Sequence, residues 1–282
     1  MSARGPGDAS ERQVVALTNN LDGVFQRSVL RGATEVLGAA GAAVSAVELG
    51  GVEQASELQE ILAGVARRAA GVLVISNAVS GEGLSTVTSA GAVATLVSHR
   101  SQAPQAPPTL MFDNRQGLQQ LVAHLVHDCG RSRPVFIGGD ASQLDAQERQ
   151  RAFLDEAARH DLRVPEGNLL TGDFTPHRAS EALQALMAAG GRFDAVVAAD
   201  YLMAIAANET LRKAGVRVPE DVAVVGFGDG PEAERAGVTT VAADVEELGR
   251  RAARQLLAQL SGRRLSGRTL LSTHLVRRAS SC

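Results

Sequence analysis

Short apolar runs alternate with longer segments of helical periodicity along most of the chain. Residues 71–75 (GVLVI) and 222–225 (VAVV) are continuous apolar runs, as expected of strands buried on both faces of a sheet. In residues 117–129 the apolar side chains recur at helical spacing and lie on one face of a helix. This alternation predicts an α/β protein whose parallel sheets are covered by helices on both faces.

Two series of such units meet near Phe112 and Asp113, after a proline-rich connector at residues 101–109. Two series indicate two sheets rather than one large sheet. The predicted strands lie at residues 14–18, 43–48, 71–75, 93–98, 109–112, 134–137, 168–171, 195–198, 222–225 and 269–276, the last as one strand or a pair. The predicted helices lie at residues 26–40, 58–69, 117–129, 146–160, 177–189, 203–214 and 245–260, and a shorter unit covers 84–90.

Composition and charge narrow the possible classes of protein. The 282 residues carry 28 Lys and Arg against 31 Asp and Glu, so a net charge of −3 provides no general basic field for nucleic acid. Residues 1–13 lack the apolar core of a secretory signal, and no apolar segment reaches transmembrane length. We therefore expect a cytoplasmic protein without membrane attachment.

The two cysteines, Cys129 and Cys282, are far apart in the sequence. They match no metal-ligand spacing and no disulfide framework. The sequence therefore predicts neither a metal site nor a disulfide, which suits a reducing cytosol. No cofactor is expected.

The segment after residues 222–225 carries the most information about function. Its glycines let the backbone turn at the carboxyl end of a strand, where ligands bind in open α/β sheets, and Asp229 lies at that edge. The order KAGVRVPEDVAVVGFGD and then TTV resembles the last part of the effector domain of lac repressor-type (LacI/GalR) transcription regulators. Collinear segments such as VVALTNNLDGVFQRS, ERQRAF and GDFT extend the resemblance over nearly the whole chain.

This resemblance implies two Rossmann-like lobes of the type I periplasmic-binding-protein kind, joined by three crossovers, with a small-molecule effector bound between them. After a tail at residues 1–11, the N-terminal lobe would comprise 12–112 and 245–262, and the C-terminal lobe 113–244 and 263–279. Regulators of this family form homodimers. Because the residues before the first strand offer no helix for a DNA groove, we expect DNA contact only through a module that this chain lacks.

Arg149 and Phe174 are the first ligand-binding candidates that the resemblance implies. Arg149 stands at the family's effector-arginine position in ERQRAF, and a guanidinium offers a fork of donors suited to hydroxyls or a carboxylate. The alternative for Arg149 is a solvated charge on a helix surface. Phe174 in GDFT stands where the family places an aromatic wall of the pocket, and burial in the ordinary core is its alternative.

Polar residues after the predicted strands complete the candidate set. Asn20, Asp22 and Phe25 occupy the first strand-to-helix loop, which faces the effector in the family, although Asp22 could instead cap the following helix. Asp200 and Asp229 follow later strands and could accept hydrogen bonds from hydroxyls. Asp200 could equally cap the helix that follows it.

Four positions depart from the family pattern in ways that reduce hydrogen bonding. Gly228, Ala199 and Ala243 stand where the family often has polar or acidic residues, and His99 stands where an acid is common. Because each lost partner in a buried pocket costs a few kcal/mol, the changes favour an effector that is less polar than a typical sugar, or a pocket no longer used. His99 could also bring pH sensitivity to the site.

Other classes of protein fit the sequence less well. The segment GFGDGP has Pro231 where the third glycine of a dinucleotide-binding loop belongs, and no nucleophile elbow, phosphate loop or zinc-protease motif is present, so we do not expect an enzyme. An exported solute-binding protein would share the fold but lacks support from a signal or from tryptophan. A cytosolic sensor acting through a protein partner remains the alternative to a regulator core whose effector is a sugar-like or less polar metabolite.

Overall fold

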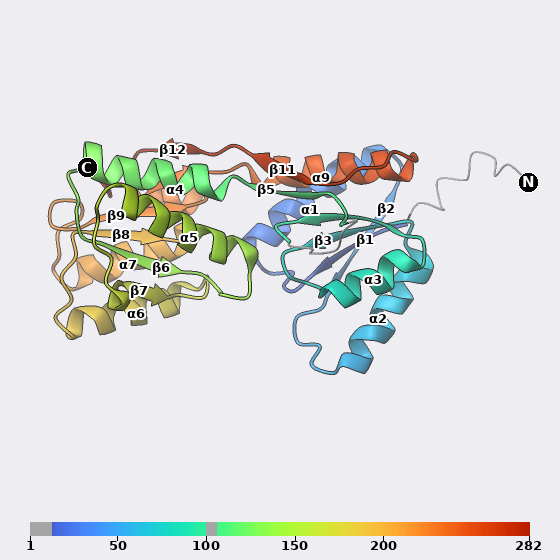
Figure 1. Cartoon of the computed structure of the whole chain (residues 1–282), viewed down its shortest axis with the longest axis horizontal. Helices are drawn as coiled ribbons and strands as arrows, with labels where there is room; N and C mark the ends of the chain where they lie inside the picture. Colours follow the sequence, from blue (N-terminus) through green and yellow to red (C-terminus); the bar gives the residue numbers. More distant parts are fainter. Residues whose placement is uncertain (1–12, 100–105) are drawn as a thin grey trace, which may run out of the picture. The chain divides into compact units, whose positions relative to one another are not determined.

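Residues 13–99 and 106–282 are described by a computed structural model, and they form two α/β units (Figure 1). The first unit comprises the chain up to Phe112 together with Asp244–Leu271, and the second comprises Asp113–Ala243 and Ser272–Cys282. The chain therefore passes between the units three times. The predicted tail at residues 1–11 and most of the proline-rich connector lie outside the described residues.

The first unit is a six-stranded parallel sheet with the strand order β11-β5-β4-β3-β1-β2. Side chains of β1, β3, α2 and α3 form one buried cluster on one face of the sheet, and α1 and α9 pack together on the other face. The strands are β1 (Gln13–Thr18), β2 (Ala43–Glu48), β3 (Gly71–Ile75), β4 (Val93–Val97), β5 (Thr109–Phe112) and β11 (Arg268–Leu271). The helices are α1 (Val24–Ala39), α2 (Ala55–Arg68), α3 (Gly81–Ser89) and α9 (Val245–Leu260).

Helices α1 and α9 approach each other closely because small residues lie at their crossing. A Cβ atom on Gly32 would lie 2.0 Å from the carbonyl oxygen of Glu246, and one on Gly249 would lie 2.1 Å from that of Val29. No real side chain tolerates such distances to a backbone atom. The two glycines therefore allow the backbones of α1 and α9 to approach each other closely, although the two helices are far apart in the sequence.

The second unit has the strand order β12-β10-β9-β8-β6-β7, and only β12 is antiparallel to its neighbour. Helices α4 and α5 pack together, as do α6 and α7 (Figure 1). The strands are β6 (Pro134–Gly138), β7 (Leu169–Thr171), β8 (Ala195–Ala198), β9 (Ala223–Phe227), β10 (Thr239–Ala242) and β12 (His274–Val276). The helices are α4 (Asn114–Ala123), α5 (Leu144–Arg159), α6 (Pro176–Ala188), α7 (Tyr201–Lys213) and α8 (Pro231–Ala236).

The C-terminal assignment of the sequence analysis needs correction. Residues 263–279 were expected to belong to one lobe, but Arg268–Leu271 pairs with β5 in the first unit and His274–Val276 pairs with β10 in the second. The predicted strand pair is thus two strands in different sheets, because the chain crosses between the units after Leu271. The predicted helix at 117–129 also differs, since α4 ends at Ala123 and a π-helical turn covers His124–Asp128.

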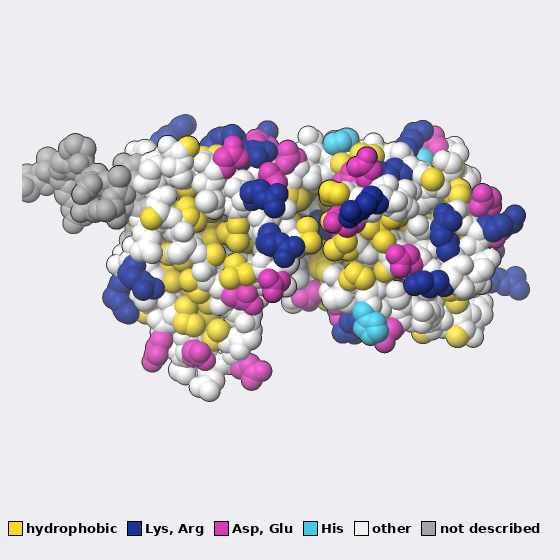
Figure 2. All heavy atoms as spheres, turned by 180° about the vertical axis from the view of Figure 1, so that it is seen from behind, with side chains coloured by type: hydrophobic (Ala, Val, Ile, Leu, Met, Phe, Trp, Pro, Cys, Tyr) yellow, Lys and Arg dark blue, Asp and Glu magenta, His cyan; other side chains and the backbone are white. Residues whose placement is uncertain are grey.

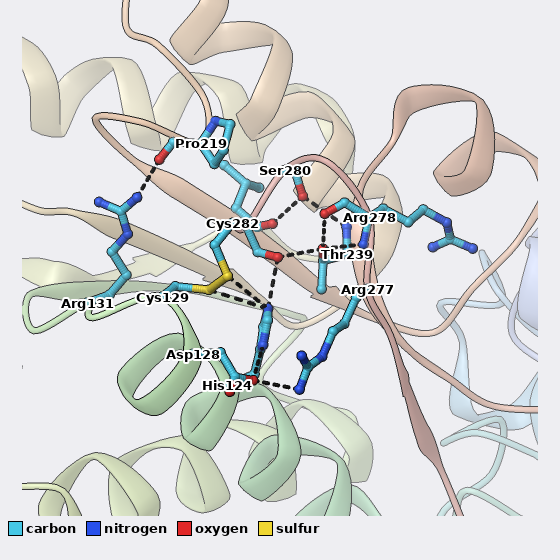
Figure 3. The surroundings of a disulfide bond; sticks show 12 residues. His124, Asp128, Cys129, Arg131, Pro219, Thr239, Arg277, Arg278, Ser280 and Cys282 are labelled. Carbon is cyan, nitrogen blue, oxygen red and sulfur yellow. Dashed lines mark hydrogen bonds and ion pairs between the residues drawn. A yellow bond between two sulfur atoms is a disulfide. The ribbon is translucent and has the colours of Figure 1, made fainter.

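The expectation that the cysteines are unpaired is wrong as well. Cys129 and Cys282 form a disulfide with Cα atoms 5.5 Å apart (Figure 3). Their sequence separation of 153 residues concealed this proximity. The turn before Cys129 and the C-terminal segment both belong to the second unit, so the disulfide links two distant segments within one unit. Within residues 13–99 and 106–282, no helix combines the length and apolar character needed to cross a membrane.

Candidate functional site

Arg149 is the centre of a buried polar cluster in the second unit, near the carboxyl ends of β8 and β9. Arg149 is only 7% exposed, which excludes the alternative of a solvated charge on the helix surface. Its Nε donates a hydrogen bond to Oδ1 of Asn114 at 2.9 Å, and its Nη1 donates one to the carbonyl oxygen of Ala199 at 2.8 Å. Helix α5 therefore supplies a guanidinium that is fixed by α4 on one side and by the end of β8 on the other.

Carboxylates and an aromatic ring surround this guanidinium. Burial lowers the pKa of Arg149 from its ordinary value, while the nearby charges of Asp145 and Asp200 oppose that shift. Asp145, one helical turn earlier on α5, places Oδ2 3.8 Å from Nη2 of Arg149. The guanidinium carbon lies 3.9 Å from the centroid of the Phe227 ring, a cation–π arrangement that also holds the plane of the fork.

Asn114 connects the cluster to the start of α4. Its Nδ2 donates hydrogen bonds to Oδ1 of Asp145 at 2.8 Å and to Oε2 of Glu148 at 3.1 Å, while its Oδ1 accepts from Arg149. The amide is 2% exposed and thus bridges charges of opposite sign away from water. Such a network fixes the positions of these side chains relative to one another.

Asp200 follows β8 and performs the capping role that the sequence suggested. Its Oδ1 accepts the backbone N–H of Met203 at 2.7 Å at the start of α7. Burial raises the pKa of this carboxyl to about 6, although the Met203 hydrogen bond and the charge of Arg149 act in the opposite direction. Asp200 is therefore a carboxyl group whose charge changes in mildly acidic solution.

Phe174 lies after β7, against the end of β6. Its backbone has a φ of 57°, in the left-handed region, and its ring rests on Gly139, where a Cβ atom would lie 2.2 Å from the ring. The residue is half-buried rather than part of the buried core, so the ordinary-core alternative is wrong. The ring therefore lies beside the residue that follows the carboxyl end of β6.

Asp229 is held by partners within the protein. Its Oδ2 accepts from Nη2 of Arg278 at 2.8 Å and its Oδ1 accepts from the hydroxyl of Thr240 at 3.0 Å. Burial would raise the pKa of Asp229, but these two hydrogen bonds and the charge of Arg278 bring it below its usual value. The side chain stays charged at neutral pH and fixes the end of β9 to β10 and to the C-terminal segment.

The remaining candidates belong to the first unit. The side-chain oxygen of Asn20 accepts the backbone N–H groups of Asp22 at 2.7 Å and Gly23 at 3.1 Å, so it shapes the loop before α1. Gly23 occupies the N-cap position without a side-chain hydrogen bond, so the expectation that Asp22 could cap the helix is wrong. Asp22 is exposed, Phe25 is half-buried, and Nε2 of His99 lies 2.8 Å from the carbonyl oxygen of Val79 in a buried position.

Four residues of the Arg149 cluster were missed in the sequence: Asn114, Asp145, Glu148 and Phe227. Asp145 had a readable signal, because it precedes Arg149 by four residues on one helix and therefore lies on the same face. Asn114 and Phe227 approach Arg149 only through the packing of α4 and β9 against α5. No local sequence pattern contains that information.

A comparison with known families now places the chain. A family model described as a periplasmic binding protein-like domain matches residues 122–281, which is more than half of the sequence. The chain belongs to this family. Among curated members with similar sequence, the HTH-type transcriptional regulator CelR of Thermobifida fusca is 35% identical over 172 residues, or 60% of this chain and 50% of the relative.

Solved structures agree with this assignment. A complex of the transcriptional regulator CelR with cellobiose matches with a TM-score of 0.85 and 26% identity over 97% of this chain and 86% of that chain. A lac repressor dimer bound to operator and an anti-inducer matches with a TM-score of 0.86, 96% and 94% coverage, and 20% identity, which shows a shared fold. The predicted two-lobed periplasmic-binding-protein-like fold is thereby confirmed.

The relatives of this periplasmic-binding-protein-like domain are transcriptional regulators rather than enzymes, in agreement with the sequence analysis. The chain spans about half the length of the curated relatives that it matches. The similarity therefore covers the ligand-binding type of domain and not the whole length of a regulator.

Proposed function

We propose that this chain is the effector-sensing and dimerisation core of a LacI/GalR-like transcription regulator. The observation that carries the proposal is the buried guanidinium of Arg149, which two hydrogen bonds and the Phe227 ring fix near the carboxyl ends of β8 and β9. The similarity to CelR, solved with cellobiose, supports a small molecule with hydroxyl groups as the effector. Contact with DNA would require a separate module, and the working form would be a homodimer.

The chemistry of the cluster suits a neutral ligand with adjacent hydroxyls. The guanidinium of Arg149 can donate a hydrogen bond to the oxygen of one hydroxyl group. The carboxylate of Asp200 can accept a hydrogen bond from a neighbouring hydroxyl group. The half-buried ring of Phe174 offers an apolar wall for the carbon face of the same molecule. Ala199, Gly228 and Ala243 supply no polar side chain, which favours an effector with fewer hydroxyls than a disaccharide.

Signalling would follow from unequal binding to two arrangements of the domain. A ligand that prefers one arrangement shifts the population toward it, and moving the balance from 1:99 to 99:1 requires a preference of about 5.5 kcal/mol. A charge-assisted contact to Arg149 contributes a part of that preference. The homodimer would pass the shift to an attached DNA-binding module.

Thermal unfolding of the purified chain with a panel of sugars, sugar phosphates, nucleosides and small acids tests the proposal. A ligand that binds only the folded state raises the melting temperature in a saturable way. We expect one chemical class, sugar-like or less polar, to do so. A flat response across the whole panel would contradict effector sensing and would favour the alternative of a sensor that acts through a protein partner.

The variant Arg149→Lys tests the site itself. Lysine keeps the positive charge among Asp145 and Asp200 but loses the planar fork, so we expect at least a tenfold weaker effector affinity with the fold retained. Alanine is a poorer choice because it would leave these carboxylates without their counter-charge. Arg151→Lys, at an exposed position of the same helix, is the matched control and should bind as the unaltered chain does. Equal affinity in both variants would remove Arg149 from the site.

A further inference from the structure

A buried histidine, His124, lies beside the disulfide of the second unit (Figure 3). Nε2 of His124 is 3.5 Å from Sγ of Cys129 and 3.9 Å from Sγ of Cys282. These three atoms, two of them from one turn and one from the C-terminal segment, all lie within 4.8 Å of one another. Imidazole nitrogen and thiolate sulfur are the ligands that Zn²⁺ prefers in proteins.

The ring of His124 is oriented by a carboxylate. Its Nδ1 lies 2.8 Å from Oδ2 of Asp128, and the same oxygen accepts from Nη2 of Arg277 at 2.6 Å. An ionised carboxylate only accepts hydrogen bonds, so Nδ1 is the donor to Asp128, and in the neutral imidazole Nε2 is the nitrogen that remains able to coordinate a metal ion. Metal-binding histidines are characteristically held by such a carboxylate. A disulfide alone has no need for this arrangement.

The C-terminal segment is held in place without the sulfur–sulfur bond. The backbone N–H of Val224 donates to the carbonyl oxygen of Ser280 at 2.7 Å, and the N–H of Ser280 donates to that of Gly237 at 3.0 Å. The hydroxyl of Ser281 lies 2.9 Å from Nε2 of His124 and 2.7 Å from that of Thr239. Cys282 therefore stays beside His124 when the disulfide is reduced, which preorganises three ligands for one ion.

We propose that the reduced chain binds one Zn²⁺, or a similar soft divalent ion, through Nε2 of His124 and the sulfurs of Cys129 and Cys282. A tetrahedral zinc site has nitrogen–sulfur edges of roughly 3.6 Å, given its bond lengths of about 2.0 and 2.3 Å. Both distances from Nε2 lie near that value. The fourth ligand would be water or the Ser281 hydroxyl, and the ion would fasten the C-terminal segment to the end of α4.

The disulfide and the metal site are alternative states of the same cysteines. A thiol or phosphine reductant supplies the two electrons that break the sulfur–sulfur bond, two protons come from solvent, and two thiols result while the reductant is oxidised to its disulfide or phosphine oxide. Binding of the ion then releases those thiol protons to solvent, because only the thiolate coordinates the metal. The oxidised chain therefore lacks two of the three ligands and should not bind the ion at this place.

Titration of the full chain with Co²⁺ tests the proposal, since Co²⁺ replaces Zn²⁺ in tetrahedral sites and absorbs light. The chain is first reduced with a phosphine and freed of metal. We expect a sulfur-to-cobalt charge-transfer band and tetrahedral visible bands that saturate at one ion per chain, with a dissociation constant below about 1 μM, and that disappear on addition of Zn²⁺. The absence of these bands in the reduced chain, or their presence in the oxidised chain, would overturn the proposal.

Two variants separate this site from other histidines. Cys282→Ser changes an exposed residue, so the fold should persist, and we expect at least a tenfold loss of affinity together with a weaker charge-transfer band. His127→Gln is the matched control, because His127 is exposed on the same turn. The centroid of its ring lies 4.9 Å from the centroid of the His160 ring. Cobalt binding that survives Cys282→Ser and is lost in His127→Gln would assign the ion to the His127–His160 pair and refute the proposed site.

Discussion

Asp200 serves two structural demands with opposite electrostatic consequences. It caps α7 through the N–H of Met203, which favours the charged carboxylate. Burial of the carboxyl nevertheless raises its pKa to about 6, although the charge of Arg149 acts in the opposite direction. An unfolded aspartate has a pKa near 3.8. At Asp200 the folded chain therefore holds more bound proton than the unfolded chain between these two values.

This difference predicts that the contribution of Asp200 to the stability of the fold decreases as pH rises. Where the folded state holds more protons, the free energy of unfolding falls with increasing pH, here between about pH 4 and pH 6. The variant Asp200→Asn can still cap the helix but does not titrate, so it should lack this part of the decrease. Melting temperatures measured across that range for both proteins provide the comparison.

Asp221 offers a control of opposite sign. The hydrogen bond from Arg217 lowers the pKa of Asp221 to about 2. Its stabilising contribution is complete above about pH 4 and is lost only as pH falls toward 2, so Asp221→Asn should retain the slope of the unaltered chain between pH 4 and pH 6. Identical slopes for Asp200→Asn and the unaltered chain would show that Asp200 does not titrate in this window.

At the scale of the helix, the crossing of α1 and α9 depends on the absence of side chains. Gly32 is buried with the carbonyl oxygen of Glu246 at 2.0 Å from any added Cβ, whereas Gly38, on the same helix α1, has no atom within 4 Å of that position. Alanine should therefore act oppositely at the two sites. Gly32→Ala should destabilise the fold by about 1–3 kcal/mol through overpacking. Gly38→Ala should stabilise it by roughly 0.5–1 kcal/mol through helix propensity.

Urea unfolding followed by circular dichroism measures both changes against the unaltered chain. The contrast between the two variants is the useful quantity, because it removes the general effect of alanine in a helix. Equal effects at the two positions would mean that α9 can move away from α1 at little cost.

The helices and strands also differ in how well the sequence revealed them. Helix α9 was predicted with its observed bounds, because its apolar face is continuous and Asp244 caps its first turn. Helix α8 was missed, since six residues starting with a proline carry too little periodicity. The π-helical turn at His124–Asp128 was also missed, because one wider turn leaves the apolar spacing almost unchanged.

The same reasoning explains what could be predicted of the candidate site. Arg149 was identified from the family resemblance of the segment ERQRAF, and Asp200 from its place directly after a predicted strand. Asn114 and Phe227 were not, because their contacts with Arg149 join segments that are far apart in the sequence. The pairing of Cys129 with Cys282 was missed for this reason as well.

For the whole molecule, charge argues against direct binding of nucleic acid. The net charge is −3, and on the face shown in Figure 2 the Lys and Arg side chains lie among Asp and Glu side chains. Tight DNA binding needs several cations aligned with phosphates. We therefore expect the 282-residue chain to leave duplex DNA unretarded at about 150 mM salt. From the similarity to regulators that act as dimers, we also expect it to sediment as a homodimer. A sequence-specific complex in a gel-shift assay, or a monomer at micromolar concentration, would contradict the corresponding half of this prediction.

Because the chain passes three times between its units, neither unit is encoded by one continuous segment of the sequence. When a ribosome has completed Phe112, the first sheet has its strands β1 to β5, but β11 and the helix that covers α1 have not yet been made. The second unit likewise waits for β12 and for Ser280, which holds Val224. Domains of nascent chains often fold in order from the N-terminus. Here the first unit is complete only when Leu271 has been added, and the second only when Ser272–Cys282 has followed, so neither unit can reach its final form early in synthesis.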